Sequence, residues 1–221
     1  MANFNGTLDY IEIPANEAPQ LANSDFTIEF YAKLLGSNSE HIIYSQDGLL
    51  QIKHNSSQMT IEFSSNSCSF NISNISEFKH YAITFNNSDN TINAYIDGTS
   101  VSSLSYNSDS NMTQHTNATG KVIIGKHITD NNKYFKGTLK QLRVFNSIKH
   151  TTTFDINNLS YSTTLDSDIL MYIPMIFKNT LSDKHTENKV YYKSNDNSTL
   201  INNYIDYTVP INNPIKTLVL Q

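Results

Sequence analysis

The 221-residue sequence contains one cysteine, no tryptophan and no cluster of basic residues. A single cysteine excludes an intrachain disulfide, and we expect Cys68 to be a small buried hydrophobic residue. Lys and Arg number 15 against 20 Asp and Glu, which gives a net charge of -5. Because this balance predicts no basic face, nucleic acid is not expected as a partner.

Long hydrophobic runs are also missing. The longest, residues 169–177, is too short to cross a bilayer and contains Pro174, so we predict no membrane insertion. Residues 1–10 lack a basic region followed by an apolar stretch, and no signal peptide is predicted.

The sequence has instead a series of short strand-like segments separated by turn residues. They are residues 7–13, 25–35, 41–45, 49–54, 58–65, 69–73, 79–85, 91–96, 121–125, 134–146 and 169–173. Short alternating strands at this spacing, rich in β-branched and aromatic residues, are typical of an antiparallel sandwich or barrel. The sequence therefore predicts an all-β protein, with at most a short helical turn beginning at Asp155.

The clearest turn signal is the pair Asp97-Gly98, which follows the alternating segment 91–96. This pattern favours a type I′ hairpin turn, in which glycine supplies the positive φ and aspartate tolerates it. A metal-binding role for Asp97 would require a second carboxylate from another loop. We predict that Asp97 is structural.

Two polar stretches without periodicity divide the remaining chain. Residues 105–120 form a long loop, and such loops are functional or disordered in compact domains. Residues 178–190 mark a boundary. The predicted organisation is one domain over residues 1–177 and a C-terminal arm or strand extension over residues 178–221, which is not an independent domain.

Several motifs occur together in the order and spacing of one known superfamily. They are "NFNGTLDYIEI", "SDFTIEFYAKL", "EFKHYAITF", "NAYIDGTSV", "GKVIIGKH" and "YFKGTLKQLRVFNSIK". Over about residues 3–150 the chain resembles the concanavalin A-like, laminin-G-like jelly-roll lectins. The resemblance implies an antiparallel two-sheet jelly-roll sandwich, here followed by a C-terminal extended arm. It also favours an extracellular, cell-surface or virion-surface location.

Individual residues in these motifs have expected structural roles. His80 occupies a structural position, and Gly125 and Gly137 stand where a side chain would crowd a strand crossing or a bend. Arg143 is expected to lie across the outer face of a sheet or to pair with a carboxylate. The chain departs from the family pattern at Phe78, where a tryptophan is common.

Catalytic patterns are missing. The paired carboxylates of glycoside hydrolases on this fold, in the pattern Glu-x-Asp-x-x-Glu, do not occur. The seven histidines show no zinc-binding spacing, and no nucleophile motif is present. We therefore predict that the protein is not an enzyme.

Sugar binding requires aromatic ring faces beside amide and carboxylate groups at a loop rim. Tyr44, Tyr106 and Tyr134 stand next to polar loops, although each of them taken singly is more typical of a partly buried sandwich aromatic. The candidate ligand-binding residues are Tyr106, Asp109, Asn111, Asp130, Asn131, Asn132 and Tyr134. Calcium is the ion that the superfamily implies, with Asp109 and Asp130 as candidate ligands, although no contiguous calcium motif occurs.

Two hypotheses for function remain open. The first is a non-catalytic lectin-like module that binds a carbohydrate or glycoprotein at the loop rim. The second is a structural or decorating component of a larger assembly, such as a virion, phage or toxin complex. In that case the jelly roll would be a protein–protein interaction scaffold, and the C-terminal arm would contact other subunits.

Overall fold

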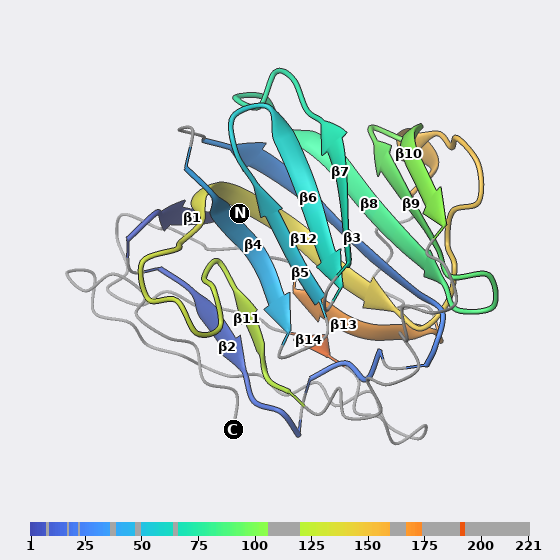
Figure 1. Ribbon diagram of the computed structural model, residues 1–221, viewed down its shortest axis with the longest axis horizontal. Coiled ribbons are helices and arrows are strands. Elements are labelled where there is room, and N and C mark those ends of the chain that lie inside the picture. The colour runs from blue at the N-terminus through green and yellow to red at the C-terminus, as the bar shows by residue number, and fades with distance from the viewer. Residues whose placement is uncertain are drawn as a thin grey trace, which may run out of the picture.

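The computed structural model describes residues 1–7, 9–16, 18–21, 23–35, 39–46, 50–63, 66–105, 120–159, 167–173 and 191–192. These residues form two antiparallel sheets that pack face to face (Figure 1). Within the described ranges the helical structure is one short 3-10 turn, η2 (Ile156–Asn158), which is capped by Asp155 as expected. The predicted all-β jelly-roll sandwich is confirmed.

The larger sheet has eight strands. In spatial order they are β10 (Thr99–Ser105), β9 (Thr91–Ile96), β8 (Lys79–Asn86), β3 (Phe26–Leu34), β12 (Lys136–Phe145), β13 (Ile169–Ile173) and β14 (Tyr191–Tyr192), with β1 (Ala2–Asn5) pairing with β12. β1 pairs with residues 136–139 of β12 and β13 with residues 142–145, so the two short strands share one side of β12.

The smaller sheet has six strands. In spatial order they are β2 (Ile11–Ile13), β11 (Val122–Ile124), β4 (His41–Gln46), β5 (Leu50–His54), β6 (Gln58–Phe63) and β7 (Asn66–Asn71). The predicted strand 7–13 is therefore shorter than expected, and Ala2–Asn5 was not expected to be a strand. The reason is a turn between the sheets, in which Gly6 has φ 83° and the carboxylate of Asp9 accepts a hydrogen bond from Asn5 N at 2.8 Å.

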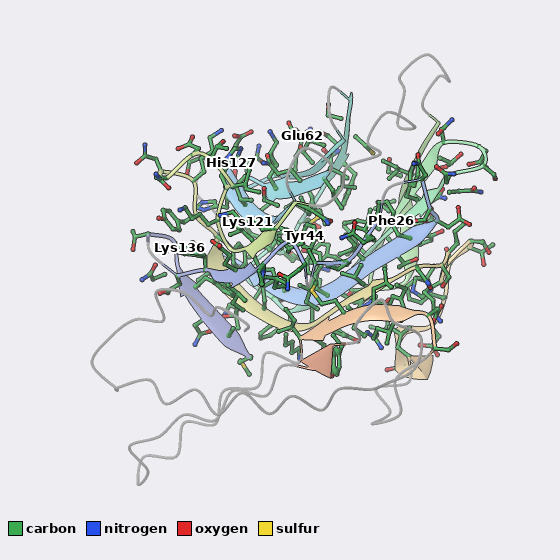
Figure 2. The ribbon with its side chains drawn as sticks, turned by 90° about the horizontal axis from the view of Figure 1, so that it is seen from below. Phe26, Tyr44, Glu62, Lys121, His127 and Lys136 are labelled. Carbon is green, nitrogen blue, oxygen red and sulfur yellow. The ribbon has the colours of Figure 1, made fainter. Side chains whose placement is uncertain are left out.

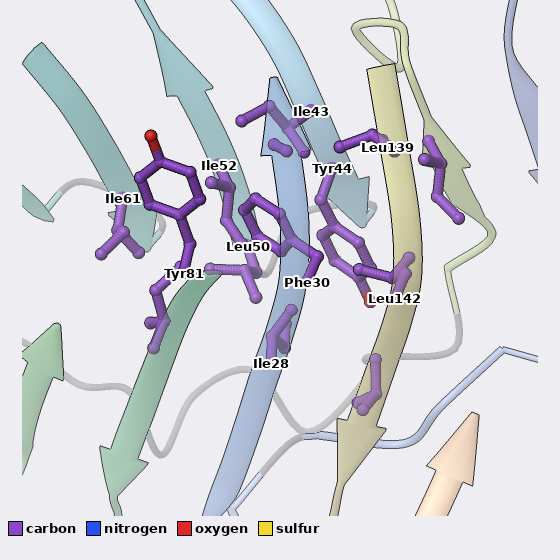
Figure 3. Close-up of a cluster of buried hydrophobic side chains, with 14 of the residues drawn as sticks. Ile28, Phe30, Ile43, Tyr44, Leu50, Ile52, Ile61, Tyr81, Leu139 and Leu142 are labelled. Carbon is purple, nitrogen blue, oxygen red and sulfur yellow. The ribbon is translucent and has the colours of Figure 1, made fainter. Parts of the chain in front are cut away.

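The core lies between the sheets and is built from the inward-facing residues of each strand. Figure 3 shows Ile28 and Phe30 of β3 and Tyr81 of β8 facing Ile52 and Ile61 of the smaller sheet. Phe30 and Tyr81 stack with their ring centroids 5.6 Å apart. Burial of this apolar surface is the main term that holds the two sheets together.

The predicted turn at Asp97-Gly98 joins β9 to β10. Asp97 has φ 48° and Gly98 has φ 77°, as a type I′ turn requires. The carboxylate of Asp97 accepts hydrogen bonds from His80 N at 2.9 Å and from Lys79 Nζ at 3.2 Å. Asp97 therefore ties the turn to β8, and its role is structural.

Residues 147–159 cross the outer face of the larger sheet, and we name this segment the strap. Thr27 Oγ1 donates to Ser147 O at 2.7 Å at one end, and Phe154 N donates to Gly98 O at 2.9 Å toward the other. Between them the ring of Phe154 stacks on His150 with centroids 3.6 Å apart. Both faces of β8 are therefore buried. The polar residues His80 and Thr84 lie on the face opposite the core, and the strap covers that face.

A buried charged cluster lies beneath the strap. Glu29 is 2% exposed and contacts Arg143 through an ion pair, and it accepts a hydrogen bond from His150 Nε2 at 3.0 Å. His80 Nε2 lies 3.6 Å from the same carboxylate. Arg143 pairs with a carboxylate, and His80 is a buried structural residue, as the sequence predicts.

Of the predicted C-terminal arm, the structure describes the two residues of β14, which pair with β13. The other residues of segment 178–221 lie outside the described part of the chain. The turn residues Asp47 and Gly48, between the predicted strands 41–45 and 49–54, also lie outside it. The boundary at residue 177 therefore remains a prediction.

Candidate functional site

The loop between β11 and β12 carries four of the predicted ligand-binding residues. Its base is closed by hydrogen bonds from Phe135 N to Gly125 O at 2.8 Å and from His127 N to Lys133 O at 2.9 Å. Gly125 has φ 91°, and a Cβ there would lie 2.5 Å from the Phe4 ring, so glycine is required at this position. These contacts fix residues 127–133 as a loop on the smaller sheet, which we name the rim loop.

His127 holds the inner turn of the rim loop. Its Nδ1 accepts hydrogen bonds from the backbone N–H of Asp130 at 2.9 Å and of Thr129 at 3.2 Å. A nitrogen that accepts carries no proton, so this geometry requires neutral histidine. Burial, together with the charge of Lys133, lowers the pKa of His127 below its ordinary value.

The tip of the rim loop presents amide groups to solvent. Asp130 is half-buried, and its Oδ1 accepts a hydrogen bond from Asn132 N at 2.9 Å, so the carboxylate closes an Asx turn. Asn131 and Asn132 are exposed. The turn therefore leaves two amide side chains available as hydrogen-bonding groups.

Two tyrosines flank a lysine beside this tip. Lys126 pairs across the loop with Tyr134 in an isolated antiparallel bridge. Its Nζ lies 4.9 Å from the ring centroid of Tyr10 and 5.7 Å from that of Tyr134. All three side chains are half-buried, and among the described residues no carboxylate pairs with Lys126. Neither Tyr10 nor Lys126 was predicted from the sequence. Tyr10 precedes β2 and Lys126 follows β11, and the two residues meet only because these strands pair.

An alternating series of ion pairs extends from the rim loop across the outer face of the smaller sheet. Lys133 Nζ lies 2.7 Å from Glu40, Glu40 lies 2.8 Å from Lys53, and Lys53 lies 2.5 Å from Glu62. Figure 2 shows His127 and Glu62 on the same side of the molecule, with Tyr44 between the two layers. Hydrogen bonds from Lys133 and Lys53 lower the pKa of Glu40 to about 2.

A pair of histidines supports the end of the rim loop from below. His41 Nδ1 donates to the backbone oxygen of Tyr134 at 2.9 Å, and its ring stacks on His54 at 5.2 Å. Burial lowers the pKa of His54 to about 4, and the nearby His41 acts in the same direction. Neither histidine was singled out from the sequence, because the two meet only through the pairing of β4 with β5.

The predicted residues divide into three groups. Asp130, Asn131, Asn132 and Tyr134 lie together in or beside the rim loop. Tyr106, Asp109 and Asn111 lie outside the residues that the structure describes. Tyr44 is fully buried in the core, which agrees with the sandwich-aromatic role that the sequence favours for it.

The position of Tyr44 has a local cause. The register of β4 against β5 shifts between Ile42 and Tyr44, which turns Tyr44 inward. Its hydroxyl donates to Gln46 Oε1 at 3.0 Å, and burial raises its pKa above the ordinary value. Tyr44 therefore cannot serve as a sugar platform.

Across the described ranges, no group of three or more His, Cys, Asp or Glu side chains is placed to hold a metal ion. Asp130 is the half of the predicted calcium pair that the structure describes. Its Oδ1 already accepts the hydrogen bond of the turn. Calcium binding by Asp109 and Asp130 remains a prediction.

The fold and its loop site define the class of the protein, an antiparallel two-sheet sandwich with aromatic and polar groups at one rim. Residues 5–151 match the family described as the concanavalin A-like lectin/glucanases superfamily. The chain belongs to this superfamily, which confirms the resemblance drawn from the sequence. No curated protein matches the chain in sequence.

Solved structures support the fold. A protein from Bacteroides ovatus ATCC 8483, named as a candidate carbohydrate-binding protein, matches with a TM-score of 0.56 at 12% identity; the match covers 85% of this chain and 56% of that one. A mutant of the NanB sialidase from Streptococcus pneumoniae matches with a TM-score of 0.51 at 13% identity, over 87% of this chain and 33% of that one. This chain thus spans about half of the first protein and a third of the second, and at such identities the likeness concerns the fold alone.

Among the described residues, no helix is long and apolar enough to cross a membrane.

Proposed function

We propose that this protein is a non-catalytic carbohydrate-binding module that docks a glycan or glycoprotein at the rim loop. The observation that carries the proposal is the arrangement of Tyr10, Lys126 and Tyr134. Two half-buried tyrosine rings flank a lysine that has no carboxylate partner in the described structure, next to the exposed Asn131 and Asn132.

The chemistry of this arrangement suits a sugar ring. Carbohydrates present a C–H face that packs on aromatic rings, and hydroxyl groups that bond to amides and charged side chains. The ion pairs from Lys133 to Glu62 hold neighbouring side chains in place before a ligand arrives. Preorganised groups lose less entropy on binding, which favours recognition of a flexible, weakly bound ligand.

The same electrostatics argue against hydrolysis at this site. Glycoside hydrolysis needs a carboxylic acid that keeps its proton near neutral pH, usually because burial raises its pKa. Glu40, which pairs with Lys133, has a pKa of about 2 and is bound by two lysines. A group that is ionised at every physiological pH cannot act as the general acid.

The remaining sequence predictions extend the proposal. Tyr106, Asp109 and Asn111 would complete the site from the long loop, and Asp109 with Asp130 would bind calcium. A glycan ligand implies an extracellular or surface location. The alternative function, a structural component of a larger assembly, uses the same sandwich as a scaffold and the C-terminal arm as the contact.

The test is binding of the purified protein to a broad glycan array, first with calcium and then with chelator. We expect selective binding that Tyr134→Ala and Tyr10→Ala each reduce about tenfold, since loss of one aromatic contact costs on the order of 1 kcal/mol. Tyr172→Ala is the matched control, because Tyr172 is a half-buried tyrosine on the outer face of the other sheet. A blank array from folded protein would refute the proposal and favour the assembly role.

A further inference from the structure

The outer face of the larger sheet carries a second group of lysines at the end of β3 and β12 that the strap leaves open. Lys33 lies on β3, and Lys136 and Lys140 lie on β12. Thr138 is opposite Lys33 and Lys140 is opposite Tyr31, so these side chains share one face and are close neighbours. No carboxylate pairs with any of the three lysines within the described part of the chain.

Lys140 is held between two aromatic rings. Its Nζ lies 5.1 Å from the centroid of Tyr31 and 4.6 Å from that of Phe78. The ring of His80, which is opposite Tyr31 on the neighbouring strand β8, makes an edge contact with the Tyr31 ring at a centroid distance of 4.8 Å. Phe78 is 37% exposed, which is unusual for a large apolar side chain in this protein. We name Tyr31, Lys33, Phe78, Lys136 and Lys140 the lysine patch.

A β-bulge next to Lys140 preserves this arrangement. The pairing of β12 with β3 shifts between Lys140 and Arg143, and the extra residue Gln141 has φ 54°. The bulge lets Lys140 face outward while Leu142 returns to the core. Bulges commonly direct a side chain at functional positions, at the cost of a strained residue.

The distribution of ion pairs makes the lysine patch distinct. Every other described lysine except Lys126 pairs with a carboxylate: Lys53, Lys79, Lys121, Lys133 and Lys149. Arg143 on the same face is neutralised by Glu29 beneath the strap. Uncompensated positive charge therefore gathers at one end of this sheet, although the chain has a net charge of -5. This local group of three lysines is much smaller than the basic face of a nucleic-acid-binding protein.

We infer that the lysine patch is a second binding surface, whose ligand is an acidic polysaccharide with carboxylate or sulfate groups. The positive charges of the three lysines attract the acidic groups of the polysaccharide, and the ring faces of Tyr31 and Phe78 accept the C–H faces of its sugar rings. Figure 2 shows Lys136 beside β1 in the lower layer, whereas His127 lies in the upper layer. The patch is therefore separate from the rim loop, and the inference does not depend on the proposed function.

The chemistry favours a polysaccharide over a nucleic acid. Nucleic-acid surfaces neutralise many phosphates at once and are strongly basic over a whole face. Here three lysines occupy one end of a sheet in an acidic protein. A polysaccharide whose acidic groups contact three lysines and whose sugar rings pack on Tyr31 and Phe78 needs no basic face of that extent.

The test compares binding of the full chain to heparin, polygalacturonate, neutral dextran and single-stranded DNA by isothermal titration calorimetry at 50 and 200 mM NaCl. We expect binding to heparin or polygalacturonate, weaker at the higher salt, and no binding to dextran at the patch. Lys140→Gln and Lys33→Gln should each weaken it about threefold, as exposed charge pairs contribute modestly. The triple variant K33E/K136E/K140E should abolish it.

Two controls separate the possible outcomes. Lys121→Gln removes the same charge from the other sheet and should leave binding to the acidic polysaccharide unchanged. Tyr134→Ala removes an aromatic ring beside the rim loop. It should weaken binding of a glycan at the rim loop and leave binding at the lysine patch unchanged. Equal loss of binding in Lys121→Gln and Lys140→Gln, binding to DNA at least as tight as to heparin, or no binding to either acidic polysaccharide would each overturn the inference.

Discussion

The substitution Glu29→Gln tests how the strap is held to the larger sheet. It keeps the shape of the side chain and removes its charge, so the buried Arg143, which is 8% exposed, loses its ion pair with Glu29. His150 and His80 lose the same partner. Removal of one member of a buried pair is costly because the other charge stays buried without compensation.

The size of the effect follows from two estimates. Burial alone would raise the pKa of Glu29, but the hydrogen bonds from His150 and His80 and the charge of Arg143 outweigh it and lower the pKa from 4.5 to about 2. This difference corresponds to about 3 kcal/mol in favour of the ionised carboxylate. Removing one partner of a buried ion pair typically costs about 3–5 kcal/mol. We therefore expect Glu29→Gln to destabilise the protein by about 3 kcal/mol at pH 7.

The pH dependence gives the decisive readout. Because the folded-state pKa is depressed, the stabilisation by Glu29 is complete above pH 4.5 and is lost as the pH falls toward 2. Urea unfolding at pH 7, 5, 4 and 3 should show the difference between wild type and Glu29→Gln shrinking below pH 4.5. Glu12→Gln, which breaks a partly exposed pair with Lys121, serves as the control and should cost less than about 1 kcal/mol. A difference for Glu29→Gln that stays below 1 kcal/mol, or does not change with pH, would refute the reasoning.

Two further predictions concern the ends of the strap and the rim loop. Gly98→Ala should destabilise the protein by about 2 kcal/mol or more in urea unfolding, because φ is 77° and the new Cβ would lie 1.9 Å from Phe154 O; a loss under 0.5 kcal/mol would contradict this contact. A glycan bound at the rim loop should keep its affinity from pH 7.5 to 6.5 and lose affinity only at lower pH, because His127 accepts hydrogen bonds only when neutral and burial lowers its pKa from the ordinary 6.5. Binding titrations in which the affinity already falls above pH 6.5, or an NMR-measured pKa of His127 above 6.5, would contradict the second prediction.

Local signals in the sequence predicted most of the fold. The turn at Asp97-Gly98 could be recognised because a type I′ turn depends on two adjacent residues that tolerate positive φ. Gly137 was expected where a side chain would crowd, and a Cβ there would lie 2.4 Å from Lys33 O. The strands were recognisable because alternation needs only one buried face in each segment.

The parts that depend on distant pairing could not be predicted in the same way. Glu29 and His150 are 121 residues apart, and nothing near either residue indicates that they meet. The lysine patch likewise exists only because β3 lies beside β12. The bulge at Gln141 is visible in the sequence pattern. Leu139 and Leu142 both face the core although they are three residues apart, whereas a regular strand places every second residue on one face.

The strap determines which part of the larger sheet can meet a ligand. Where it crosses, Arg143, His80 and His150 gather around one carboxylate, so the positive charge of that region is neutralised and removed from solvent. On the other side of His80, Tyr31 faces outward with Lys140 over its ring. The buried cluster and the lysine patch thus follow from one arrangement, because the same strand β3 carries Glu29 beneath the strap and Tyr31 and Lys33 beyond it. A change that released the strap would expose Arg143 and extend the positive surface, so the stability of the Glu29 cluster also limits the area available to an acidic ligand.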